Sequence, residues 1–166
     1  MARVLVTMYG RSTWGLFNSV WAAIKDHDYL PDKVTILTSG CDLTQAQVAG
    51  KMVEILLHEY GNHAEVKQLV VDDEEVRTIS DTVLKLATQE KGAGNQVALD
   101  VTPARKMFVL GAVLAGWNKP IFDHVFYLHI GSLKNANRSY VEIPSSIQHA
   151  HDIMADLKKG GKEGGA

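Results

Sequence analysis

Several features that would mark a specialised class of protein are missing from this chain of 166 residues. It has a single cysteine, Cys41, so it cannot form an internal disulfide or supply a cysteine-based zinc site. It has no long apolar run, and its first residues, MARVLVTMYG, have the pattern of a strand and not of a signal peptide. We therefore expect a cytoplasmic protein without a membrane partner.

An excess of basic charge and the common nucleotide motifs are also absent. The 17 lysines and arginines are balanced by 19 aspartates and glutamates, so no overall field attracts duplex nucleic acid. The first expected loop, YGRSTWG, lacks the glycine spacing of a dinucleotide fold, and no GxxxxGK[ST] forms a phosphate loop.

His149 and His151 form an HxH pair without a third ligand nearby, which is weak evidence for a metal. We expect no cofactor and no metal, and any nucleotide must be bound by a local site.

What the chain does contain is an alternation of short β-branched runs with longer helical patterns. Several of the runs are too continuously apolar to have a face in water, which is typical of a parallel sheet. We expect strands at 2–8, 33–38, 65–71, 96–101 and 124–130. Helical patterns lie between them at 14–26, 43–60, 74–90 and 104–116. The order predicts an α/β protein with a Rossmann-like open, mainly parallel sheet and helices on both faces.

The pattern changes after the fifth expected strand. The polar stretch GSLKNANRSYVEIPSS contains a strand-like YVEI that is closed by Pro144, which predicts a short C-terminal hairpin-like extension. Residues 145–158 are weakly helical in pattern. We expect one domain over residues 1–157 and a flexible, glycine-rich tail or linker stub over residues 158–166.

The stretch LDVTPARKMF links the fourth expected strand to the fourth expected helix and has the makings of an anion site. Asp100 and Thr102 end the strand, and Arg105 and Lys106 open a helix whose free backbone N–H groups favour negative charge. Thr102 could instead only cap the helix ahead of Pro103, with both cations in solvent. Because cations in a first turn oppose the helix dipole by about 0.3–1 kcal/mol each, a bound phosphate explains them better.

Two further strand-to-helix loops carry groups that suit a ligand. In MYGRSTWG, Gly10 allows a tight turn, Arg11 can reach a phosphate, and Ser12 or Thr13 can bond a ligand or cap the helix. The loop LTSGCDLT offers similar groups, with helix capping as an equally good explanation for them: Thr38, Ser39 and Gly40. The loop VVDDEE is acidic and would repel a phosphate.

The sequence resembles the CARF domain, the CRISPR-associated Rossmann-like module, over most of residues 1–145. The resemblance is carried by VLVTMYGRSTWGLFNSVW, ALDVTPARKMFVLGAVLAG and YVEIP. In the family the fourth-strand motif reads Asp, hydrophobic, Thr, small residues, Lys and often Met. The residues that fit this motif are Asp100, Thr102, Lys106 and Met107. The chain departs from it at Pro103 and Ala104, where the family often has glycine.

The resemblance implies a homodimer whose first and fourth loops line one symmetric pocket for a cyclic oligoadenylate. Cyclic tetra-adenylate is the expected ligand, ahead of cyclic hexa-adenylate, and a type III CRISPR complex would produce it. Free-standing members of the family include ring nucleases, which use the ribose 2′-hydroxyl to cleave the ring without a metal and leave a 2′,3′-cyclic phosphate. The alternative is a non-catalytic sensor that controls a separate or fused effector.

By this resemblance, we expect three residues to be catalytic: Lys106, Ser12 and Thr13. Tyr9, Trp14 and Met107 are candidates for the walls around adenine, although Trp14 could equally belong to the core. The complete set of expected ligand-binding residues is Tyr9, Gly10, Arg11, Trp14, Thr38, Ser39, Gly40, Asp100, Thr102, Pro103, Ala104, Arg105 and Met107.

Overall fold

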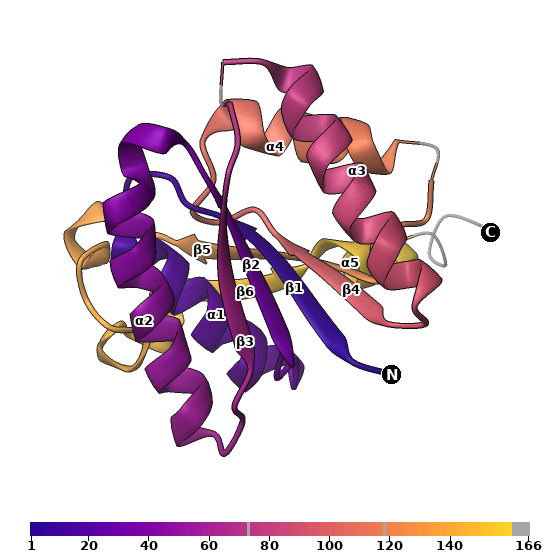
Figure 1. The fold of residues 1–166 in the computed structure, drawn as a ribbon. Helices are drawn as coiled ribbons and strands as arrows, with labels where there is room; N and C mark the ends of the chain where they lie inside the picture. Colours follow the sequence, from indigo (N-terminus) through magenta and orange to yellow (C-terminus); the bar gives the residue numbers. More distant parts are fainter. Residues whose placement is uncertain (73, 118, 161–166) are drawn as a thin grey trace.

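A six-stranded sheet forms the centre of the protein, in the strand order β3-β2-β1-β4-β5-β6 (Figure 1). The computed structural model describes residues 1–72, 74–117 and 119–160. The strands are β1 (Arg3–Met8), β2 (Lys33–Thr38), β3 (Glu65–Val70), β4 (Gln96–Asp100), β5 (His124–Ile130) and β6 (Gln148–Asp152). Neighbouring strands are parallel from β3 through β5, and only β6 is antiparallel to its neighbour. The Rossmann-like sheet predicted from the sequence is confirmed.

Helices cover both faces of this sheet (Figure 1). They are α1 (Thr13–His27), α2 (Leu43–Glu59), α3 (Val76–Gly92), α4 (Lys106–Gly116) and α5 (Ile153–Gly160). Because side chains alternate along a strand, Leu5 of β1 packs with α1 and α2, while the adjacent Val6 packs with α3 and α4. The first four helices and the first five strands match the predicted ranges to within two residues. Within the described residues, no helix is both long and apolar enough to cross a membrane.

The C-terminal region differs from the expectation in its details. YVEI is not a strand: Tyr140–Glu142 form a 3-10 helix, and the backbone N–H of Ser139 donates to the Glu142 carboxylate at 3.0 Å. The strand that pairs with β5 is instead Gln148–Asp152, within a region that we expected to be weakly helical. The last helix continues to Gly160, so residues 158–160 of the predicted tail are helical. The rest of that predicted tail, residues 161–166, lies outside the described residues.

Candidate functional site

The loops that follow β1 and β4 meet at the carboxyl edge of the sheet. These strands are adjacent and parallel, and Thr7 lies opposite Asp100 in their register. Both loops therefore leave the sheet at the same level, as expected for a ligand site in an open α/β fold. Together they line a cleft of about 480 Å³ with six residues: Gly10, Arg11, Pro103, Ala104, Arg105 and Lys106. All six were predicted from the sequence as ligand-binding or catalytic residues, and the fold brings them together.

Asp100 lies beneath this cleft and is completely buried. Its carboxylate accepts hydrogen bonds from the hydroxyls of Thr7 at 2.8 Å and Ser19 at 2.6 Å, and from the backbone N–H of Thr102 at 3.0 Å. Burial raises the pKa of Asp100 above its usual value, although these hydrogen bonds act in the opposite direction. Asp100 thus orders the turn after β4 but does not reach the surface, which does not favour its predicted contact with a ligand.

Thr102 neither caps α4 nor faces the cleft. Its Oγ1 accepts a hydrogen bond from the backbone N–H of Leu128 at 2.9 Å, which ties the loop to β5. The helix starts at Lys106, two residues later than predicted, and no side chain caps its N-terminus. The predicted phosphate contact of the Thr102 hydroxyl stays a prediction. The N-terminal backbone N–H groups of α4 are left without a side-chain acceptor from the capping position.

The three cations of the two loops have different environments. Arg11 and Lys106 are exposed, and among the described residues neither forms an ion pair or a side-chain hydrogen bond. Arg105 instead forms an ion pair with Asp42, which lies in the loop after β2. Arg105 lines the cleft but is held by a carboxylate, so the positive charge most open to an anion is that of Arg11 and Lys106.

The hydroxyls of the first loop have structural partners. Ser12 Oγ accepts a hydrogen bond from the backbone N–H of Gly15 at 2.9 Å, which caps α1. Thr13 Oγ1 lies 3.2 Å from the Tyr9 hydroxyl. Neither Ser12 nor Thr13 is among the residues that line the cleft, although both follow Arg11 directly. The capping alternative considered from the sequence is confirmed for Ser12, and a further role for its hydroxyl stays a prediction.

The three residues expected to contact adenine, Tyr9, Trp14 and Met107, differ in how far they are exposed to solvent. Tyr9 is only 3% exposed and belongs to the core, which does not favour its predicted role as a wall. Trp14 is half-buried and lies edge-on against Phe17, with ring centroids 5.8 Å apart. Met107 is 37% exposed at the start of α4 and remains accessible to a ligand.

The loop after β2 does not contribute to the cleft. Thr38 and Ser39 are buried. The Thr38 hydroxyl donates to the Ser39 carbonyl at 3.2 Å, and the Ser39 hydroxyl donates to the Asp42 carboxylate at 2.9 Å. Gly40 is exposed but does not line the cleft. The predicted ligand contacts of these three residues stay predictions, without support from the lining of this cleft. Asp42 makes no capping hydrogen bond to α2 and instead joins this loop to Arg105.

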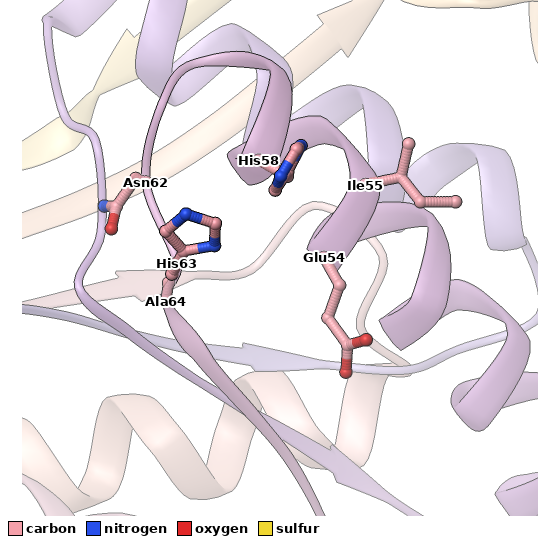
Figure 2. Close-up of a pocket in the computed structure, with 6 residues that line it drawn as sticks. All are labelled: Glu54, Ile55, His58, Asn62, His63 and Ala64. Atoms are coloured by element: carbon pink, nitrogen blue, oxygen red, sulfur yellow. The ribbon is translucent and has the colours of Figure 1, made fainter.

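A second cavity, of about 380 Å³, lies at the C-terminal end of α2. Figure 2 shows the imidazole of His58 on the last turn of the helix and that of His63 close to it, after the turn. The two ring centroids are 5.0 Å apart. His63 and Ala64 directly precede β3, so this cavity opens at the opposite edge of the sheet from the cleft. Within the described part of the chain, no three or more side chains are grouped in a way that could hold a metal ion.

Comparison with solved structures identifies proteins of the same fold. Csm6 from Enterococcus italicus, bound to cyclic hexa-2′-fluoro-hexa-dAMP, superposes with a TM-score of 0.61 and 13% identity over 95% of this chain and 44% of its own. A type III CRISPR defence DNA nuclease activated by cyclic oligoadenylate gives a TM-score of 0.59 and 14% identity over 79% of this chain and 19% of its own. Can2 from Sulfobacillus thermosulfidooxidans, in complex with cyclic tetra-adenylate, gives a TM-score of 0.54 and 14% identity. The superposition covers 75% of this chain and 31% of Can2.

These likenesses concern the fold, because every identity is far below the level at which function is shared reliably. The chain spans less than half the length of each of these proteins. Neither a protein-family model nor a curated protein matches it. The architecture that the resemblance to CARF proteins implies is nevertheless confirmed. The chain has the Rossmann-like fold of the CARF-domain proteins of type III CRISPR systems.

Proposed function

We propose that this protein binds a cyclic oligoadenylate, most readily cyclic tetra-adenylate, in the cleft between the β1–α1 and β4–α4 loops. The observation that carries the proposal is the meeting of Arg11, Lys106 and the uncapped N-terminus of α4 around one cleft. Backbone N–H groups at a helix start and nearby cations are the usual means of binding phosphate. The three fold relatives described above, which are bound to or activated by such ligands, use nucleotides of this chemical class.

We further propose that the protein acts as a homodimer. The outer side of α4, which begins at the cleft, carries a row of exposed apolar side chains, from 37% to 66% exposed: Met107, Leu110, Val113, Leu114 and Trp117. A continuous apolar row on a soluble domain is typical of an interface. A second copy packed on α4 about a twofold axis would place two Lys106 side chains near each other. A cyclic tetra-adenylate has matching twofold symmetry.

The cleft also fits slow, metal-independent cleavage of the bound ring. In that reaction the ribose 2′-oxygen loses its proton and forms a bond to the adjacent phosphorus, and the bond from phosphorus to the 5′-oxygen breaks. The departing 5′-oxygen takes up a proton, which leaves a 2′,3′-cyclic phosphate and a 5′-hydroxyl. Lys106 would neutralise the charge that develops on the phosphorane, while positioning of the ribose supplies the in-line geometry. The Ser12 oxygen accepts from Gly15, so its hydroxyl proton remains able to donate to a phosphate oxygen.

A sensor that binds the ring without cleaving it is the second candidate, and one observation favours it. The hydroxyls of Ser12 and Thr13, both expected from the sequence to be catalytic, are engaged with Gly15 and Tyr9. Such a sensor would control an effector domain or a separate effector protein. In this case Arg11 and Lys106 would bind the ring in the same way, and no product would form.

Incubation with radiolabelled cyclic tetra-adenylate in EDTA, followed by chromatography, separates the candidates. We expect retention of the label by the protein and slow appearance of linear products that end in a 2′,3′-cyclic phosphate. Lys106→Ala should weaken binding at least tenfold and abolish cleavage, whereas Lys119→Ala, at an exposed position outside the cleft, should change neither. Bound but intact ring identifies the sensor. Absence of binding at micromolar protein contradicts both candidates.

A further inference from the structure

Four aromatic side chains stand together on one side of the β5–β6 ribbon. In the register of the two strands, Tyr127 lies opposite His151 and His129 lies opposite His149. Phe126 and Leu128 of β5 point to the α1 side, where they join the core clusters. Because side chains alternate along a strand, these four rings all project on the other side, where α4 lies. We call this group the ring face.

The ring face is open to solvent. Tyr127 is 39% exposed and the His151 side chain is 44% exposed, while His129 and His149 are exposed as well. The helix α5 packs over Val125, farther along β5, where Ile153 and Met154 line an apolar cavity with it. It therefore lies over the amino end of β5, and it reaches the ring face through Asp156, whose carboxylate lies 3.2 Å from His151 Nδ1.

The rings are spaced as a row and not as a packed cluster. The ring centroids of Tyr127 and His129 are 6.4 Å apart, and those of Tyr127 and His151 are also 6.4 Å apart, with planes 22° from parallel. Tyr127 and His151 are stacked on each other, and their exposed fractions show that part of each ring stays open to another flat group. The imidazoles and the phenol are polar at their edges, so this surface suits a planar polar ligand better than an aliphatic one.

The ring face adjoins the loop that forms one wall of the candidate cleft. The backbone N–H of Leu128, which lies between Tyr127 and His129, donates to Thr102 Oγ1 at 2.9 Å. Thr102 directly precedes Pro103, a residue that lines the cleft. A nucleotide chain whose phosphates lie against Lys106 thus has an exposed row of rings beside it.

We propose that the ring face stacks unpaired adenine bases of an oligoadenylate whose phosphates are held in the cleft. This proposal rests on the proposed function and extends its site from the two loops to an open sheet face. Charge in the cleft and flat rings beside it are the two components of single-strand binding surfaces. Each base that stacks on an aromatic side chain contributes about 1–3 kcal/mol, which corresponds to about 5- to 150-fold in affinity.

The test compares two probes of equal charge: linear tetra-adenylate and an abasic tetranucleotide with the same backbone. Dissociation constants are measured by fluorescence anisotropy for the wild type, Tyr127→Ala, Tyr127→Phe and His149→Ala. We expect Tyr127→Ala and His149→Ala each to weaken tetra-adenylate binding at least fivefold and to leave abasic binding unchanged. Tyr127→Phe keeps the ring and should bind like the wild type. The matched controls, Tyr60→Ala and His63→Ala, remove exposed rings from the far end of α2 and the turn after it.

The outcomes separate this proposal from the proposed function. Equal loss of both probes in Tyr127→Ala would show a structural effect and overturn the stacking role. Unchanged tetra-adenylate affinity in both Ala variants overturns it too, while a loss of affinity in Lys106→Ala would still support the cleft. If the wild type binds neither linear nor cyclic tetra-adenylate, both proposals are wrong.

Discussion

A Cβ atom at position 10 would stand 1.9 Å from the carbonyl oxygen of Pro103. The two loops of the candidate cleft thus approach each other so closely that only glycine fits at this point. Gly10 is therefore needed for the contact between the loops and not for an unusual backbone angle.

We expect Gly10→Ala to lower the free energy of unfolding by about 1–3 kcal/mol, because the loops must separate to admit a methyl group. Oligoadenylate binding should weaken along with it. Urea unfolding measures the first effect and titration with cyclic tetra-adenylate the second. Gly92→Ala, at the end of α3, is the matched control: no atom lies within 4 Å of the place that a Cβ would take there, so stability should be unchanged or slightly raised. Equal stability of the two variants would contradict the close contact.

Ser12 combines a structural role with a proposed chemical one, and two substitutions separate them. Ser12→Ala removes the acceptor for the Gly15 N–H and should cost about 1 kcal/mol of unfolding free energy. Ser12→Asn can still cap α1 and should retain most of the stability, but it lacks the hydroxyl. If the hydroxyl assists cleavage, both variants turn over cyclic tetra-adenylate more slowly than the wild type. Normal turnover by Ser12→Asn would remove the hydroxyl from the mechanism.

Asp100 should make stability depend on pH, with a defined sign. Because its pKa is raised in the folded protein, the stability that its protonated form contributes is fully present below pH 3.8 and is lost as the pH rises through the raised pKa. Asp100→Asn should remove this loss. Between pH 3.8 and the raised pKa, the unfolding free energy of the variant should therefore rise relative to that of the wild type by up to about 1.4 kcal/mol per pH unit. Urea unfolding between pH 4 and pH 8 tests this. Asp81→Asn, at an exposed position, serves as the control, and parallel curves for the wild type and Asp100→Asn would contradict the prediction.

The proposed dimer predicts an effect of charge on the outer side of α4. Leu110 is 54% exposed, so Leu110→Glu should fold normally but separate the copies of this 18.2 kDa chain. Light scattering at micromolar concentration should show a dimer for the wild type and a monomer for the variant. Leu157→Glu places the same charge on α5, where the side chain is 69% exposed, and should leave the dimer intact. A monomeric wild type would mean that each cleft acts alone.

Much of the fold could be predicted from the sequence because β1, β2 and β4 are apolar enough to require burial on both faces. The strand-like YVEI was misleading, since Ser139 and Glu142 pair locally and turn it into a 3-10 helix. The true last strand, QHAHD, was missed because its exposed positions are histidines, which have no marked strand preference. Its alternation of exposed His149 and His151 with inward-facing residues was the available signal.

The candidate site was predicted less completely, because its geometry depends on contacts between distant residues. Asp42 and Arg105 are 63 positions apart, and nothing in either loop indicates that they pair. Tyr9 was expected at the surface but is buried, since its strand continues into the core. Ser19 could have been noticed as a hydroxyl on the apolar side of α1, where it reaches Asp100. The apolar residues all around α4 were a similar sign that some of them would lie at the surface of the single chain.

The hydrogen bonds of Asp100 have a thermodynamic consequence for any guest of the cleft. Thr7 of β1, Ser19 of α1 and the Thr102 backbone all converge on this one carboxylate. The elements that carry the β1–α1 loop and the start of the β4–α4 loop are thus bonded to the same buried carboxylate. A movement of one loop away from the other would strain these hydrogen bonds. A ligand would meet a cleft that is already formed, so little conformational entropy would be lost on binding. The affinity would then depend chiefly on charge and stacking, and hence on salt concentration and on the bases of the ligand.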